Sequence, residues 1–234
     1  MIAAVDDSTA QILAAYRDFA ARLQGAVVLS MTRPSATPMP VELNALTALE
    51  REQGAAHARM LREAAQGVAS DAISVSSGEH TASFLDTVSS FVSALTSEHI
   101  ERHCAHLRIM AREAGRTLNS FFWRLDGLQK TGMTPANAQV KAREQYLASQ
   151  PAGQFMDAAG RRWKGETLVF TNTYALLRRV WNEVTLMSAV HQGHTEIAWH
   201  TPEGETLLGV EGQILSLEYA ENPRGRGYFS LDSK

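Results

Sequence analysis

The sequence has very little cysteine and no long apolar run. Its 234 residues include a single cysteine, Cys104. This excludes a disulfide within the chain and fits a reducing compartment or a particle assembled in one. No run of about eighteen apolar residues occurs, so we expect no membrane-spanning helix. The first residues, MIAAVDD, lack a basic segment followed by an apolar one, so we expect no secretory signal.

Lysine is also scarce, whereas arginine is common. The chain carries eighteen arginines and four lysines, and its formal net charge is −3. This balance excludes an overall positive field that would recruit nucleic acid. The arginine excess has two interpretations. One is a GC-rich coding sequence. The other is a preference for the planar guanidinium group, which binds carboxylates or phosphates at interfaces through two hydrogen bonds.

The motifs of the common enzyme classes are missing. The sequence contains no serine-centred nucleophile elbow, no phosphate-binding glycine loop and no Cys-x-x-Cys pair. Glu203 and Glu205 form a Glu-Gly-Glu triplet with the spacing seen in ADP-ribosyltransferases. Acidic pairs beside glycine are common in surface turns, so this triplet alone does not indicate catalysis. We therefore expect neither an enzyme nor a bound cofactor.

Apolar residues at helical spacing dominate the chain. Ser8 begins a capping-box pattern that predicts the start of the first helix, and Thr134 followed by Pro135 predicts the start of another. Pro34, Pro38 and Pro40 predict an extended arm near 32–40. Helices are expected over 41–68, 81–114, 117–128, 135–147 and 165–190.

Short strands are expected after the last of these helices. The segment 196–201, the apolar pairs between 207 and 217, and 228–231 are typical of strands separated by turns. The expected fold is mainly α, a multi-helix body with long helices and a small C-terminal β cap. We expect residues 1–150 to form the helical body with its proline-rich arm. Residues 151–234 are expected to form a long apolar helix and the β tail.

Three histidines share one stripe of the helix expected over 81–114. His99, His103 and His106 are spaced four and three residues apart, and the stripe continues the apolar positions of that helix. Two interpretations stay open for them. They form hydrogen bonds within a helix–helix interface, or they supply ligands for a metal site or a pH-sensitive contact. Cys104 points away from the stripe and is a poor fourth ligand.

Two pairs of arginines form local basic clusters. Arg161 and Arg162 precede a tryptophan, and Arg178 and Arg179 lie in the apolar helix. Basic residues beside an aromatic ring can contact phosphate and stack on a base. Such pairs are also typical of solvated faces and salt bridges. Any DNA contact made by these four arginines would be local, salt-sensitive and non-specific.

The order of features in the C-terminal half follows a recognisable pattern. A glycine-led segment precedes a core helix that continues through an asparagine, and a glycine, a strand with tryptophan and a Gly-Gln turn then follow. These features are Gly127–Pro135, Val169–Tyr174, Asn182, Gly193, Trp199 and Glu211–Ile214. In this order the chain resembles the head morphogenesis family of tailed phages, the minor head proteins similar to protein F of phage Mu. The resemblance covers roughly residues 120–230.

Two departures from the family pattern limit what the resemblance implies. Asn172 and Thr173 stand where the helical core of the family has an acidic residue. Leu207 and Leu208 stand where many members place histidine or cysteine ligands. The metal-binding role of the family's tail is therefore not carried over to this chain.

The resemblance implies a structural virion protein, a minor head or portal-proximal component assembled in the host cytoplasm. Its partners would be other head or portal subunits, with a non-specific contact to packaged DNA, no membrane contact and an oligomeric state in the particle. A head–tail adaptor ring beneath the portal is an alternative within the same biology. A helical metalloprotein that uses His99, His103 and His106 is an alternative of another class.

Overall fold

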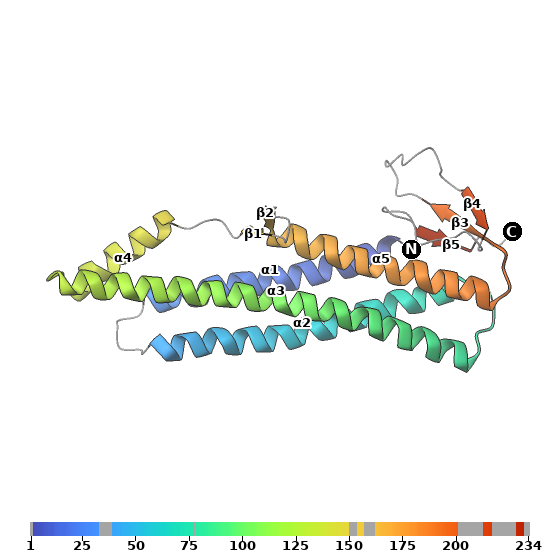
Figure 1. Ribbon diagram of the computed structural model, residues 1–234, viewed down its shortest axis with the longest axis horizontal. Helices are drawn as coiled ribbons and strands as arrows, with labels where there is room; N and C mark the ends of the chain where they lie inside the picture. The colour runs from blue at the N-terminus through green and yellow to red at the C-terminus, as the bar shows by residue number, and fades with distance from the viewer. Residues whose placement is uncertain are drawn as a thin grey trace. The chain divides into compact units, whose positions relative to one another are not determined.

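The computed structural model describes residues 2–32, 39–76, 78–149, 154–156, 162–200, 213–216 and 228–231. Within these residues the fold is mainly α, with long helices and a small β cap near the C-terminus, as predicted (Figure 1). The helices are α1 (Ile2–Thr32), α2 (Met39–Val75), α3 (Ala82–Lys130), α4 (Pro135–Ser149) and α5 (Gly165–His191). The strands are β1 (Gln154–Met156), β2 (Arg162–Lys164), β3 (Glu196–His200), β4 (Gln213–Ser216) and β5 (Tyr228–Ser230). None of the described helices is long and apolar enough to cross a membrane.

The first helix starts earlier than its capping-box pattern predicts. Helix α1 begins at Ile2, and Ser8 lies inside it, so the start predicted at Ser8 is wrong. The physical reason is that the apolar stripe extends back to Val5, which is buried. Thr9 donates its hydroxyl to the Val5 carbonyl at 2.7 Å, a bond that requires a helical turn before Ser8 is reached.

Helix α2 also extends beyond its predicted bounds. It begins at Met39, so Pro40 lies in its first turn and not in the extended arm, and it continues to Val75. A first-turn proline is compatible with a helix because its missing N–H would have no partner there in any case. The rest of the proline-rich arm, residues 33–38, lies outside the described residues.

One continuous helix replaces the two that were predicted around Gly115. Helix α3 runs from Ala82 to Lys130 without a break, so the predicted helix end at Gly115 is wrong. Glycine serves close packing here, because a Cβ at Gly115 would lie 3.2 Å from Leu43 Cδ2. Leu107 and Leu118 are buried on either side of it, and their burial favours helix on both sides.

The ends of the shorter helices follow their sequence signals. The Thr134 carbonyl accepts the amide of Ala138 at 2.9 Å at the start of α4, and the Thr134 hydroxyl accepts the amide of Asn137 at 3.4 Å. At the end of α5, Gly193 adopts a φ of +73°, and His194 N–H bonds the Ala189 carbonyl at 3.0 Å. This glycine cap turns the chain toward β3.

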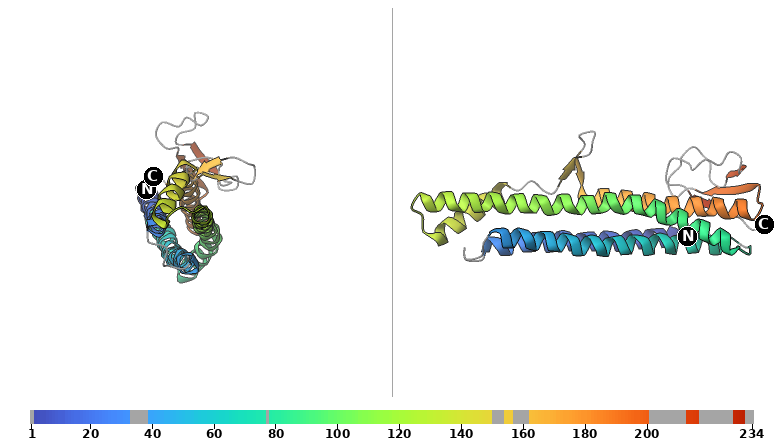
Figure 2. Two further views of the ribbon diagram at one scale, coloured as in Figure 1. Left: turned by 90° about the vertical axis from the view of Figure 1, so that its left-hand side faces the viewer. Right: turned by 60° about the horizontal axis from the view of Figure 1, so that its bottom comes forward.

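Two small antiparallel sheets complete the described fold. The pair β1 and β2, which the sequence did not predict, aligns Phe155 with Trp163 and leads directly into α5 (Figure 2). The cap is a three-stranded sheet in the order β4-β3-β5. Trp199 of β3 is in register with Gln213 of β4 and with Phe229 of β5.

The chain forms two compact units that share its long helices. Unit 1 comprises Met1–Ile12, Arg59–Ile100 and Phe170–Lys234, and unit 2 comprises Leu13–Ala58 and Glu101–Val169. Each unit thus draws on stretches from both sides of residue 150. That boundary, predicted between a helical body and a tail, itself falls outside the described residues.

Each unit has its own buried core. In unit 1 Ala189 of α5 packs with Ile197 of β3 and Phe229 of β5, and Trp181 is buried as well. Most of the large buried side chains of unit 2 belong to α1 and α3, and α2 adds Leu46 and His57. Those of α1 and α3 include Tyr16, Phe19, Leu23, Met31, Leu107, Leu118 and Phe121.

Candidate functional site

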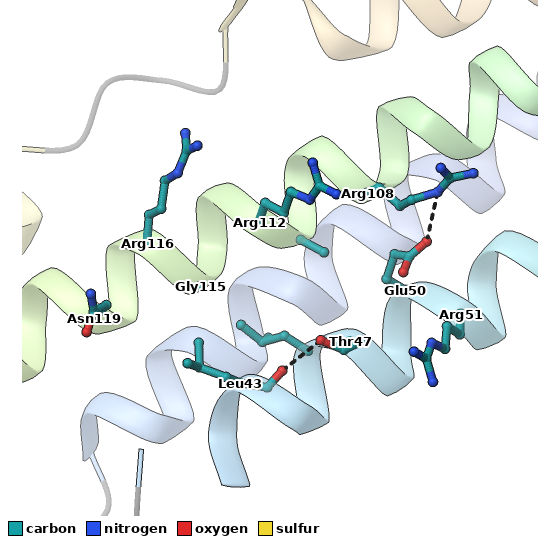
Figure 3. A pocket seen from close by; sticks show the side chains of 11 residues that line it. Leu43, Thr47, Glu50, Arg51, Arg108, Arg112, Gly115, Arg116 and Asn119 are labelled. Carbon is teal, nitrogen blue, oxygen red and sulfur yellow. Dashed lines mark hydrogen bonds and ion pairs between the residues drawn. The ribbon is translucent and has the colours of Figure 1, made fainter. Parts of the chain in front are cut away.

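An open groove of about 730 Å³ lies between α2 and α3 in unit 2 (Figure 3). Its lining from α2 consists of Leu43, Leu46, Thr47, Glu50 and Arg51. Its lining from α3 consists of Arg108, Ala111, Arg112, Gly115, Arg116 and Asn119. We call this feature the arginine groove, because four of its eleven lining residues are arginines.

Three of these arginines form a row along α3. Arg108, Arg112 and Arg116 follow one another at intervals of four residues. Each interval advances about 6 Å along the helix axis and turns the side chain by only about 40°, so the three project on one side. Figure 3 shows them in a row on α3, with Arg51 projecting from α2.

Glu50 is the acidic residue of the lining. Its carboxylate lies 3.8 Å from the Nε of Arg108, and its side chain is only 14% exposed, whereas that of Arg108 is 53% exposed. Four arginines against this one glutamate leave the lining with a formal charge of +3. In a chain with a net charge of −3, the arginine groove is therefore a local positive surface.

The close packing of α2 against α3 determines the shape of the groove. Gly115 allows Leu43 to approach the backbone of α3, and Leu46 is buried beneath. Thr47 donates its hydroxyl to the Leu43 carbonyl at 3.1 Å, which occupies its donor. The groups that remain to face a ligand are mainly guanidinium N–H donors. Such donors bind phosphate or carboxylate oxygens, often in pairs, so the groove is suited to binding an anion.

The histidines predicted to bind metal lie along α3, and one of them pairs with a histidine of α2. His103 Nε2 lies 2.8 Å from His57 Nδ1 in unit 2, with the rings stacked at 4.9 Å between centroids. Among the described residues, no group of three or more His, Cys, Asp or Glu side chains is placed to hold a metal ion. The metal prediction for His99, His103 and His106 therefore finds no ligand set there. For His103, the other prediction, a hydrogen-bonded histidine between helices, is confirmed.

Burial shifts the titration of several groups around this pair. It lowers the pKa of His57, partly opposed by a hydrogen bond to the backbone of Ala15, and it lowers the pKa of His106. Tyr16 lies 6.0 Å from His106 between ring centroids. Burial, with a smaller effect from the negative charge of Glu166, raises the pKa of Tyr16 to about 12. Burial thus favours the neutral form of each of these three side chains in unit 2.

The sequence prediction missed His57 and the arginine groove. His57 follows Leu46 by eleven residues and precedes Leu61 by four, so its place on the buried stripe of α2 could have been read from the spacing. The row of Arg108, Arg112 and Arg116 was also visible as an interval of four. The approach of Arg51 from α2 depends on helix packing and has no local signal.

The arginines predicted to contact a partner or DNA are less well placed. Arg161 and the side chain of Arg162 lie outside the described residues. Arg178 is half-buried, and burial lowers its pKa, opposed by the charge of Tyr174. Arg179 Nε lies 3.8 Å from Glu183 Oε1, one turn further along α5. Neither described arginine forms a basic surface comparable to the arginine groove.

The C-terminal cap is attached to α5 by buried hydrogen bonds. Trp181 Nε1 donates to the Phe229 carbonyl, and Asn182 Oδ1 accepts the Phe229 amide. In the cap, His200 Nε2 lies 2.7 Å from Ser230 Oγ. The predicted acidic triplet and the two leucines at the ligand positions lie outside the described residues. They are Glu203, Glu205, Leu207 and Leu208.

Comparison with known proteins found no match. No family model, no curated protein and no solved structure matches the chain.

Proposed function

We propose that this chain is a structural component of a tailed-phage head, a minor head or portal-proximal protein that docks to other head or connector subunits. The proposal includes a contact with packaged DNA and assembly into an oligomeric particle. It assigns no chemical reaction to the chain. The surface of unit 2 and the order of elements from α5 onward both support it.

The observation that carries the proposal is the exposure of Trp123. This residue lies on α3 in unit 2, and 68% of its surface is exposed. Tryptophan buries a large apolar area when it is covered, and it is enriched among the residues that dominate binding energy at protein interfaces. A tryptophan left this open on a long helix is typical of a surface that a partner covers.

Trp123 is one of several large apolar side chains on the outside of unit 2. Ile109 is 45% exposed, Leu29 is 51% exposed and Val140 of α4 is 58% exposed. Single exposed apolar residues are normal, so each alone means little. Their occurrence on α1, α3 and α4 of the same unit supports docking to more than one neighbour.

The arrangement after residue 165 supports the family resemblance. Helix α5 contains Asn182 and is followed by Gly193, then by β3 with Trp199, and later by β4, which begins at Gln213. The resemblance expects a helix, a glycine and a tryptophan strand in this order. Its late Gly-Gln turn is not seen, because Gln213 and Ile214 lie in β4 and Gly212 lies outside the described residues. The cap that results is joined to α5 by Trp181 and Asn182.

The test measures binding of the purified chain to the portal protein of the phage genome that encodes it. Replacing a docking tryptophan costs at least about 2 kcal/mol when it is central to an interface, so Trp123→Ser should weaken binding about thirtyfold. The matched control is Arg124→Ser, which changes the neighbouring exposed residue and should leave affinity within about threefold. Equal affinities of Trp123→Ser and the wild type would contradict docking through this surface.

A head–tail adaptor ring beneath the portal is the second form of the proposal, and it is also a structural protein of a tailed phage. It differs in stoichiometry, because an adaptor forms closed rings of fixed number, whereas a minor head protein is bound in few copies. Mass measurement of the purified chain, alone and with the portal, distinguishes the two. A closed ring formed by the chain alone favours the adaptor.

A further inference from the structure

We propose that the arginine groove binds the phosphodiester backbone of duplex DNA, as a non-specific contact to phosphate oxygens. This inference rests on the proposed function and deepens it, because it assigns the DNA contact to a surface between α2 and α3. The arginines of the groove are Arg51, Arg108, Arg112 and Arg116. They differ from the four arginines that the sequence predicted for this role.

The spacing of the row matches a phosphate backbone. Arg108 and Arg116 are eight residues apart on one helix, which corresponds to about 12 Å along its axis. Each strand of duplex DNA carries one phosphate per about 3.4 Å of axis and also winds around that axis, so successive phosphates of a strand are farther apart than this rise, and a row of about 12 Å reaches about three of them. A row of guanidinium groups of that length can follow one strand across successive phosphates.

The arginines are available for such a contact. Arg51, Arg112 and Arg116 are exposed, and among the described residues no carboxylate pairs with any of the three. Arg108 forms a long ion pair with Glu50, 3.8 Å from Nε to Oε1, and its side chain remains 53% exposed. No lysine lines the groove, and the planar arginine fork is the side chain best suited to bidentate phosphate contacts.

An acidic amphipathic helix would also carry negative charge at helical intervals, but the groove offers it little apolar surface. The apolar side chains of the lining are Leu46, which is only 3% exposed, the partly buried Leu43, which packs against Gly115, and the small Ala111. A helix bound in a groove depends on large apolar anchors that enter apolar pockets. The groove offers four arginines but only Leu43 as a large, partly exposed apolar side chain, and this favours a phosphate backbone.

The test is fluorescence anisotropy of a labelled duplex of about 20 base pairs with the full chain, across about 50–200 mM salt. Wild-type affinity should fall with salt at a logarithmic slope of about −3, as expected for three or four neutralised phosphates. Arg112→Gln combined with Arg116→Gln should flatten that slope by about 1.8 and weaken binding between roughly tenfold and a hundredfold at low salt.

Two further variants make the result specific. Arg112→Lys combined with Arg116→Lys retains the charge and should keep most of the slope, which separates an electrostatic contact from damage to the fold. Arg62→Gln combined with Arg143→Gln removes the same charge from exposed positions of α2 and α4 outside the groove, and should leave the slope unchanged. An equal loss in this control pair, or loss of the slope in the lysine pair, would overturn the assignment.

Comparing the affinities for three negatively charged ligands identifies which kind of ligand the groove binds. Duplex DNA should bind more tightly than a single strand of the same sequence and more tightly than polyglutamate of equal charge. Tighter binding of the single strand or of polyglutamate would overturn the duplex assignment, the latter in favour of an acidic protein partner. Absence of duplex binding at low salt would overturn it altogether. Portal binding through Trp123 is measured without DNA, so either inference can fail without the other.

Discussion

Trp181 and Phe229 are joined across 48 positions of sequence by a buried hydrogen bond of 2.9 Å from the indole Nε1 to the backbone carbonyl. The next residue of α5, Asn182, accepts the amide of the same Phe229 at 3.0 Å. Strand β5 is an edge strand of the cap, because the order is β4-β3-β5. Side chains of α5 therefore satisfy the backbone groups at Phe229, which would otherwise be exposed to pairing with another strand.

Removing the Asn182 acceptor should loosen this attachment. Asn182→Ala leaves the buried Phe229 amide without that partner, and we expect a loss of about 1–3 kcal/mol in the free energy of unfolding. Urea denaturation followed by circular dichroism measures the change. Asn172→Ala, at an exposed position of the same helix, is the matched control and should lie within about 0.5 kcal/mol of wild type. Equal stability of the two variants would show that the Asn182 bond contributes nothing.

The fold class could be predicted from the sequence, but the attachment of the cap could not. Helical spacing and the glycine at 193 locate α5 and its end. Burial of Asn182 inside an apolar helix has no local explanation, because its partner is an amide 47 residues away. The sequence also misplaced the helix end at Gly115, since a glycine that permits close packing looks the same as one that ends a helix.

Two glycines inside helices should respond differently to alanine. Gly25 of α1 has nothing within 4 Å of an added Cβ, so Gly25→Ala should stabilise the protein by up to about 1 kcal/mol through helix propensity. At Gly115 the added Cβ would lie 3.2 Å from Leu43 Cδ2, so Gly115→Ala should gain less or lose stability. Thermal unfolding of the two variants side by side measures the difference. A larger gain at Gly115 would contradict the close packing of Leu43 against this glycine.

Unit 2 should lose stability in mild acid. The folded state lowers the pKa of His57 and of His106 below the ordinary value of 6.5, so the unfolded chain takes up protons first as the pH falls. The stability is thus fully present above about pH 6.5 and declines below it, by at most about 2.7 kcal/mol per pH unit for the two groups together. Thermal unfolding between about pH 7.5 and 5.5 measures this decline.

Histidine variants assign the acid sensitivity to these residues. His57→Gln should be less stable at neutral pH, because it disturbs the pair with His103, but it should show a shallower decline below pH 6.5. His194→Gln, at an exposed position, should keep the wild-type decline. An unchanged decline in His57→Gln would mean that other groups cause the acid sensitivity.

Chelation should not destabilise the protein. A structural metal contributes its binding free energy to folding, so its removal lowers the melting temperature. His103 is hydrogen-bonded to His57, and no metal-ligand cluster occurs among the described residues, so we expect the same melting temperature with and without a chelator. Stoichiometric zinc, iron or manganese in the purified chain, lost together with stability on chelation, would restore the metalloprotein alternative.

The arginine groove shows why the candidate site was not predicted. Adjacent arginines such as Arg178 and Arg179 are conspicuous in a sequence, yet neighbours on a helix point about 100° apart and rarely form one surface. Arg112 and Arg116 are separated by four residues and share a side of α3, but Arg51 lines the same groove only because α2 packs against α3. A site assembled by two helices requires the tertiary structure to be recognised.

The most direct test of the structural role is quantitative mass spectrometry of purified, DNA-filled heads from the phage that encodes the chain. We expect the chain to be present in every head in a small fixed number relative to the portal subunit, and to remain after salt and nuclease washing. Heads that are complete and infectious without the chain, or a chain found only in the unassembled fraction, would contradict it.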